Sequence, residues 1–384
     1  MTTLPARGFP NAEFQSRTRK AQGLMRDAGL SALLLTTEPE IRYYTGYLTR
    51  FWESPTRPWF VIVPENGEPI AVIPSIGAHL MGQTWITDIR TWSSPNYKDD
   101  GVGLLAETLR ELVPKNERIG VAYDMESHVR MPMASFESLK TSIGSRDIVS
   151  DQAITRRLRL IKSEAEIEKI RMAISIADRA FNRVPEIARS GAPLSEVFRK
   201  FQALCLDEGA DWMPYLAGAA DQGGYFDVIS PATDEPLTEG DVLMLDAGLV
   251  WDGYFCDFDR NFSVGAPSPD VSSAHTRLIA ASAAAFEKAQ PGNTIRDLFD
   301  AMTGALNASD DVGRFGHGLG MQLTEWPSII ADDHTVLEPG MVLTLEPVTT
   351  LPSGKIMVHE ENIVIRETDA EYLTSPQAPE IRVV

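Results

Sequence analysis

Carboxylates that lie close to apolar segments are the residues of this chain most able to do chemistry. Asp246 ends the apolar run Val242–Leu245, and Asp257 stands 11 residues further on, after a segment that suits a second strand. If the two strands form an antiparallel hairpin, both carboxylates can face the same pocket. An aspartate beside a glycine at a strand end is, by itself, more often a turn residue. The pair therefore needs supporting residues before it indicates a site.

Three later segments supply that support. His317 lies between two glycines, which let the backbone bring an imidazole close to a bulky or charged group, although a lone histidine in such a turn is usually a loop residue. Glu346 ends the apolar run Val342–Leu345, and Glu360 precedes a similar run. Four carboxylates gathered in one region carry more negative charge than apolar burial can offset, so they require a cation. Four carboxylates and one imidazole suit two adjacent Mn, Fe, Co or Zn ions.

The first part of the chain alternates between helical and strand-like patterns, which indicates an α/β domain. Gly29 is expected to end the first helix, and an Asn-Gly pair between two apolar runs predicts a tight hairpin. The elements predicted here are helices at 13–28 and 102–113 and strands at 31–35, 59–64, 69–74 and 118–123.

A capping box at Ser163–Glu166 predicts the start of a long amphipathic helix, and we place the domain boundary just before it. The chain is thus expected to form two domains, at about residues 1–155 and 160–384. The further elements predicted in the second domain are helices at 194–208, 272–289 and 294–306 and strands at 242–245, 342–345 and 362–365.

In this order, these segments resemble the creatinase/methionine aminopeptidase superfamily, called pita-bread for its fold, and within it the Xaa-Pro dipeptidase and aminopeptidase P branch. Ile41–Tyr47 is similar to the family's N-terminal domain, and Leu158–Ile167 is similar to its linker and first helix. The resemblance implies an α/β (α+β) chain: an N-terminal creatinase-like domain, then a pita-bread metallopeptidase domain. It also implies a homodimer.

By the same resemblance, five residues match the family's metal ligands: Asp246, Asp257, His317, Glu346 and Glu360. Glu346 also resembles the residue that accepts a proton from the attacking water. Glu361 is the alternative last ligand, because adjacent residues of a strand point to opposite faces. The leading hypothesis is hydrolysis of a C–N bond in a dipeptide by metal-activated water.

The chain departs from the peptidase pattern at several positions where the family has histidine or arginine. No histidine occurs in 212–239, Gly313 and Thr324 stand where histidines are usual, and Val358 stands in place of an arginine. The loss of one oxyanion donor can lower a rate by about 10²–10³, so several losses indicate a changed substrate. Two alternatives follow: a hydrolase or lyase for a small zwitterion, as in ectoine hydrolase or a dimethylsulfoniopropionate lyase, and a binding module without catalysis. Retention of all five ligands opposes the binding module, which would also work after chelation.

Four residues are candidates for substrate contact. Thr324, counted with Glu346 as catalytic, and Tyr225 are proposed donors to an oxyanion. Trp52 and Arg57 lie in an aromatic and cationic run, 50–59, that could hold a zwitterion through cation–π and ionic contacts. The alternative for this run is a packed hairpin edge with solvated arginines.

Composition excludes some classes of partner. The formal net charge is −19 and no basic patch interrupts it, which opposes binding to nucleic acid and to anionic membranes. The two cysteines, Cys205 and Cys256, are too few for a disulfide framework, and no run of 18 apolar residues occurs. We therefore expect a cytoplasmic protein that acts on a small molecule or dipeptide.

Overall fold

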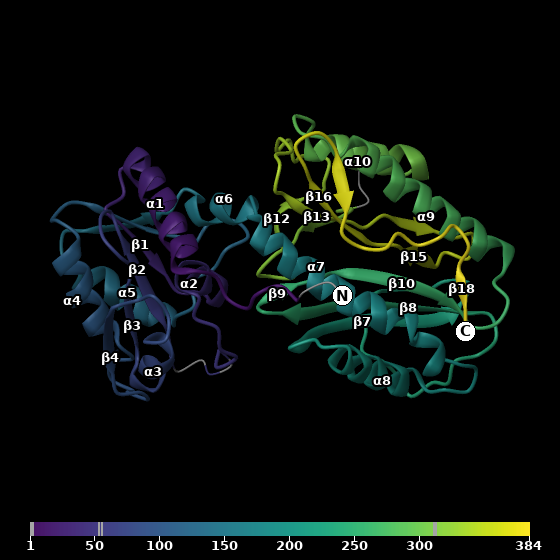
Figure 1. The fold of residues 1–384 in the computed structure, drawn as a ribbon, viewed down its shortest axis with the longest axis horizontal. Helices are drawn as coiled ribbons and strands as arrows, with labels where there is room; N and C mark the ends of the chain where they lie inside the picture. The colour runs from purple at the N-terminus through teal and green to yellow at the C-terminus, as the bar shows by residue number, and fades with distance from the viewer. Residues whose placement is uncertain (1–3, 53, 55–56, 310–312) are drawn as a thin grey trace. The chain divides into compact units, whose positions relative to one another are not determined.

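The computed structural model describes residues 4–52, 54, 57–309 and 313–384. Contacts divide the described part of the chain into two compact units, Ala6–Arg159 and Leu160–Val384. Figure 1 shows the N-terminal unit in purple and blue and the C-terminal unit in teal to yellow.

The N-terminal unit is built on a six-stranded mixed sheet with the order β4-β3-β2-β1-β5-β6. Its strands are β1 (Ala32–Leu35), β2 (Phe60–Pro64), β3 (Ile70–Pro74), β4 (Asp88–Trp92), β5 (Arg118–Val121) and β6 (Asp147–Ser150). The predicted hairpin is confirmed, since β2 pairs antiparallel with β3. The central strands β1, β2 and β3 are buried along their whole length, as expected for strands that are covered on both faces.

The helices of this unit are α1 (Asn11–Ala28), α2 (Glu38–Thr45), α3 (Ala78–Met81), α4 (Val102–Leu112), α5 (Met133–Ser142) and α6 (Ile154–Leu160). Of these, α1, α3 and α4 contact strands of the sheet (Figure 1). Leu105 and Leu109 of α4 and Leu139 of α5 pack in one apolar cluster with the sheet. The first helix ends at Gly29 as predicted, because Gly29 adopts a left-handed conformation with φ 64°.

The C-terminal unit contains two larger sheets, each with helices on its outer side (Figure 1). The first has the order β18-β10-β8-β7 with β9 paired to β8, and the second has the order β12-β11-β13-β16-β17. The strands of the first sheet are β7 (Trp212–Gln222), β8 (Asp241–Trp251), β9 (Tyr254–Phe255), β10 (Phe258–Ser263) and β18 (Arg382–Val383). Those of the second are β11 (His317–Gly318), β12 (Glu325–Ser328), β13 (Val342–Leu345), β16 (Glu361–Ile365) and β17 (Ala370–Tyr372), while β14 (Val348–Thr350) and β15 (Ile356–Val358) form a separate pair.

The helices of this unit divide between the two sheets. They are α7 (Glu164–Asn182), α8 (Leu194–Asp207), α9 (Pro269–Lys288) and α10 (Ile295–Leu306). Helix α7 contacts β8, and α8 contacts β7. Helix α9 contacts β13 and α10, and apolar residues of α9 and α10 pack in one cluster with the second sheet. The capping box predicted at the start of α7 is present, with Ser163 and Glu166 bonding reciprocally to each other's amides. This arrangement is the predicted pita-bread domain.

Among the described residues, no helix is both long enough and apolar enough to cross a membrane.

Candidate metal site

The hairpin predicted to carry the two aspartates is present. Strand β8 pairs antiparallel with β10, and Asp246 is the direct partner of Asp259, while Asp257 lies just before β10. Residues that pair directly lie on the same face of a sheet, so Asp246 and Asp259 point to one side. The prediction that Asp246 ends its strand is wrong: β8 continues to Trp251, and all of its residues are buried. Asp246 is thus a carboxylate in the middle of a buried strand.

Glycines bring His317 to the same place. Gly316 has φ 133°, and a Cβ on it would lie 2.2 Å from the carbonyl oxygen of Thr344. Only glycine allows this close approach of the two backbones. The Nδ1 atom of His317 lies 2.9 Å from the carbonyl oxygen of Gly318, which can only accept a hydrogen bond. Nδ1 therefore carries the proton, and the lone pair of Nε2 is left to bind a metal.

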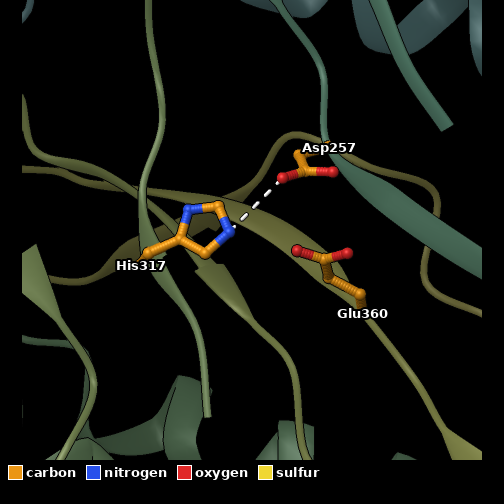
Figure 2. Close-up of side chains that lie close together, drawn as sticks. All are labelled: Asp257, His317 and Glu360. Atoms are coloured by element: carbon orange, nitrogen blue, oxygen red, sulfur yellow. Dashed lines mark ion pairs between the residues drawn. The ribbon is translucent and has the colours of Figure 1, made fainter. Parts of the chain in front are cut away.

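Three of the predicted ligands converge in Figure 2, where the side chains of Asp257, His317 and Glu360 point toward one another. Each offers a ligand atom within 4.8 Å of those of the other two. Nε2 of His317 lies 3.3 Å from Oδ2 of Asp257. All three side chains are buried, with exposed fractions of 4% or less. The cluster joins the first sheet, through Asp257, to the second.

The electrostatics of these carboxylates require a counter-charge. Burial raises the pKa of Asp246, Asp257 and Glu360 well above their usual ranges, and the other carboxylates of the site raise it further. Burial and the charge of Asp246 likewise raise the pKa of Glu346, which is half-buried. Within the described part of the chain, Oδ1 of Asp246 and Oε1 of Glu360 are buried without a hydrogen-bond partner. Oxygen atoms of this kind, beside an imidazole lone pair, fit a divalent metal centre.

The structure also separates the two adjacent glutamates. Oε2 of Glu361 accepts a hydrogen bond from Nη2 of Arg260 at 3.0 Å, and its Oε1 lies 3.0 Å from Nε2 of His359. Burial raises the pKa of Glu361, but the charge of Arg260 and the bond from His359 outweigh it and hold the pKa at about 2. Glu361 is therefore committed to an internal ion pair, while Glu360 faces Asp257 and His317. The carboxylate with which Arg260 forms its ion pair is thus that of Glu361.

Tyr215 on β7 contacts the site, although no pattern in the sequence predicts it. Its hydroxyl donates a hydrogen bond to Oδ2 of Asp246 at 2.9 Å. Strand pairing places Tyr215 directly opposite Gly248, where a Cβ would come within 3.0 Å of the tyrosine's own Cβ. The glycine makes room for the ring, and the ring fixes the orientation of the carboxylate. Only pairing between distant strands brings these residues together.

Replacing Tyr215 by phenylalanine is expected to weaken metal binding by about 10–100-fold, the usual effect of removing a group that orients a ligand. The fold should be preserved, because the ring and its contacts remain. Competition for metal against a chromogenic chelator measures the change. Unaltered affinity would show that Asp246 needs no help from this hydroxyl.

The candidate donors from the sequence lie in different surroundings. Tyr225 is 1% exposed, donates to Oδ1 of Asn261 and accepts a hydrogen bond from the amide of Val358. The hydroxyl thus already donates one hydrogen bond and accepts another within the protein. This fits a structural contact between β10 and β15 better than a donor to substrate. Thr324 is exposed, in the loop that precedes β12. It is accessible to a substrate.

Trp52 and Arg57 belong to the N-terminal unit, and part of their run lies outside the described residues. The guanidinium of Arg130 stacks on the ring of Trp52 at 5.2 Å and donates to the carbonyl oxygens of Trp52 and Ser54. The guanidinium of Arg57 lies over the ring of Phe51 at 5.1 Å. The cation–π contacts of this run are therefore made within the run and with Arg130.

Comparison with known proteins agrees with this geometry. Residues 168–367 match the model of metallopeptidase family M24, and residues 17–161 match the creatinase/prolidase N-terminal domain. The chain is 28% identical over 391 residues to a probable dipeptidase PepE of Mycobacterium bovis, covering 99% of each chain. It is 30% identical over 255 residues to an Xaa-Pro dipeptidase of Pyrococcus horikoshii, covering 64% of this chain and 72% of that one.

The fold has solved counterparts. The crystal structure of dipeptidase PepE from Mycobacterium ulcerans is 25% identical and superposes with a TM-score of 0.85 over 98% of this chain and 99% of the other. The prolidase from Pyrococcus horikoshii OT3, at 22% identity, shares the fold with a TM-score of 0.82 over 95% of this chain and 100% of the other. From the matched family model, the shared fold and the converging ligands, we conclude that this chain belongs to metallopeptidase family M24.

Proposed function

We propose that the protein is a metal-dependent dipeptidase that hydrolyses the peptide bond of dipeptides, including those with a C-terminal proline, and that it uses two divalent ions. The observation that carries this proposal is the buried cluster of Asp257, His317 and Glu360, with Asp246 and Glu346 close enough to raise the pKa values of its carboxyls. Four carboxylates need more than one positive charge to be compensated, which supports two ions.

The relatives support a peptide substrate. Those reported above carry the names dipeptidase and Xaa-Pro dipeptidase, and the first of them spans nearly the whole chain. No comparable relative supports the small-zwitterion lyase or the binding module among the proteins compared above. The missing histidines therefore indicate altered substrate contacts within a peptidase.

The residues of the chain can be assigned roles. When bound, divalent ions would make a water acidic enough to ionise near neutral pH, and they would also polarise the substrate carbonyl. Glu346 is the proposed proton acceptor, because it is the most accessible of the five proposed ligands. Thr324 stays a proposed donor to the developing oxyanion, since its hydroxyl is exposed on the loop beside the site.

The test is hydrolysis of a dipeptide panel by the purified protein, stripped of metal and reconstituted with Mn, Fe(II), Co or Zn, with metal content determined alongside. We expect about two ions per chain and turnover that chelation removes and metal restores. Glu346→Gln should abolish turnover. Two bound ions without turnover of any dipeptide would point to a small non-peptide substrate, and a chain that binds no metal would overturn the proposal.

A further inference from the structure

The loop 319–324 connects β11, which carries His317, with β12. The amide of Leu319 donates to the carbonyl of Val342, and the carbonyl of Gly320 accepts from the amide of Phe255 at 2.9 Å. On its other side, Leu323 lies so close to Gly248 that a Cβ there would come within 2.4 Å of Cδ1 of Leu323. The loop therefore packs against β8 beside Tyr215 and Asp246, and its position sets where Thr324 stands.

One carboxylate organises this loop. Oε1 of Glu325 accepts hydrogen bonds from the amides of Met321 at 2.9 Å and Gln322 at 3.2 Å. Both carboxylate oxygens also lie 2.9 Å from where a Cβ on Gly320 would stand, so a larger residue there would displace the carboxylate. Glu325, the first residue of β12, thus holds the loop against the start of that strand.

The other oxygen of this carboxylate is held by a buried cation. Oε2 of Glu325 lies 3.1 Å from Nζ of Lys162, and the two side chains are only 7% and 2% exposed. The amide of Lys162 donates to the carbonyl of Gly340, just ahead of the strand that ends beside Glu346. The lysine is thus fixed to the end of the second sheet, which also carries His317, Glu346 and Glu360. A buried ion pair of this kind has a defined geometry that exposed pairs lack.

We propose that the Lys162–Glu325 ion pair is a positioning device that holds the loop 319–324 in its catalytic conformation. Neither residue touches the reacting atoms. Lys162 is bonded to the backbone next to β13, and Glu325 is bonded to the loop amides. The ion pair between them therefore restricts the motion of the loop relative to β13. The expected effect on catalysis rests on the proposed function, whereas the effect on the loop does not.

Hydrogen exchange measured on the purified protein tests the structural part without any substrate. Lys162→Met should speed exchange of the amides of Met321 and Gln322 by at least about tenfold, because the carboxylate of Glu325 loses its buried cation and moves toward solvent. The matched control is Lys169→Met. It breaks an equally buried pair, with Asp252, whose side chains are 2% and 8% exposed. The control should leave exchange in the loop unchanged, and faster loop exchange in both variants would mean general destabilisation.

Kinetics on the best dipeptide, with metal saturating, test the catalytic part. Lys162→Met is expected to lower kcat about 100-fold, the effect of misplacing a catalytic group by about 1 Å, with metal content unchanged. Adding Glu325→Gln should restore much of the loss, because the neutral amide can still accept from both loop amides and needs no cation. Protected loop amides and normal kcat in Lys162→Met would overturn the proposal. If no dipeptide is hydrolysed at all, the proposed function fails, while the exchange result still decides the role of the ion pair.

Discussion

Replacing Asp257 by asparagine is expected to stabilise the metal-free protein and, at the same time, to abolish metal binding and peptidase activity. Burial, followed by the charge of Glu346, raises the pKa of Asp257 well above its usual range. A carboxyl whose pKa is higher in the folded protein stabilises it at low pH, and this contribution is lost as the pH rises through the folded pKa. At pH 7–8, far above the pKa of an unfolded aspartate, Asp257 therefore destabilises the metal-free protein, and the neutral amide removes that cost.

The same substitution removes a ligand from the centre of the cluster. Activity should fall by at least about 10³-fold, which corresponds to the loss of several kcal/mol of transition-state stabilisation by metal. Thermal unfolding measures the other two effects. With chelator, the Tm of the variant should exceed that of the wild type; with added metal, the wild-type Tm should rise and that of the variant should not.

Asp178→Asn is the matched control for this experiment. Asp178 is also a carboxyl whose pKa is raised by burial, but its Oδ2 accepts from the amide and hydroxyl of Ser375. The control should keep the rise of Tm with metal and the full activity. If Asp257→Asn destabilises the metal-free protein, then the buried carboxylates are compensated by protein groups, and the argument for a metal loses its physical basis.

Much of the fold could be predicted from the sequence because its signals are local. The capping box of Ser163 fixed the start of α7, Gly29 fixed the end of α1, and Asn-Gly gave the β2–β3 hairpin. Helix α2 was missed: it is short, and its proline near the start and its own capping box at Thr37 and Glu40 were the signals that could have indicated it. Strand β7 was also missed, because it contains Gly218 at φ 155° and lacks the continuous apolar run that marks its neighbour β8.

The four carboxylates proposed as metal ligands could be predicted because each lies within or next to a run of apolar residues, where an uncompensated charge is costly. The groups that support them could not. Tyr215 lies 31 residues before Asp246 and meets it through strand pairing, and Lys162 lies 163 residues from Glu325. No periodicity within one segment encodes such pairs, because they depend on how the strands are aligned. The same applies to Tyr225, whose hydroxyl forms hydrogen bonds with Asn261 of β10 and Val358 of β15.

Glu361→Gln is expected to lower the free energy of unfolding by roughly 3 kcal/mol at pH 7, measured with chelator present. Burial raises the pKa of Glu361, but Arg260 and the hydrogen bond from His359 lower it to about 2, against 4.5 for a free glutamate. A carboxyl whose pKa is lower in the folded protein contributes stability above the unfolded pKa and loses it as the pH falls toward the folded pKa. The difference between wild type and variant should therefore be constant above pH 5 and should shrink below about pH 4.5.

Urea unfolding at pH 7, 5 and 4 measures this difference, and Glu371→Gln is the control. Glu371 also pairs with arginines, Arg171 and Arg366, but its side chain is 41% exposed, so its loss should lower stability by less than about 1 kcal/mol. The two effects differ because water can solvate the arginines near Glu371 but not Arg260, which is only 4% exposed. Among the described residues, Glu361 is the only carboxylate within ion-pair distance of Arg260, so the substitution leaves a buried charge without it. Equal effects of the two substitutions would mean that water reaches Arg260. In that case the internal pair would not be what keeps Glu361 away from the metal ligands and leaves Glu360 to face them.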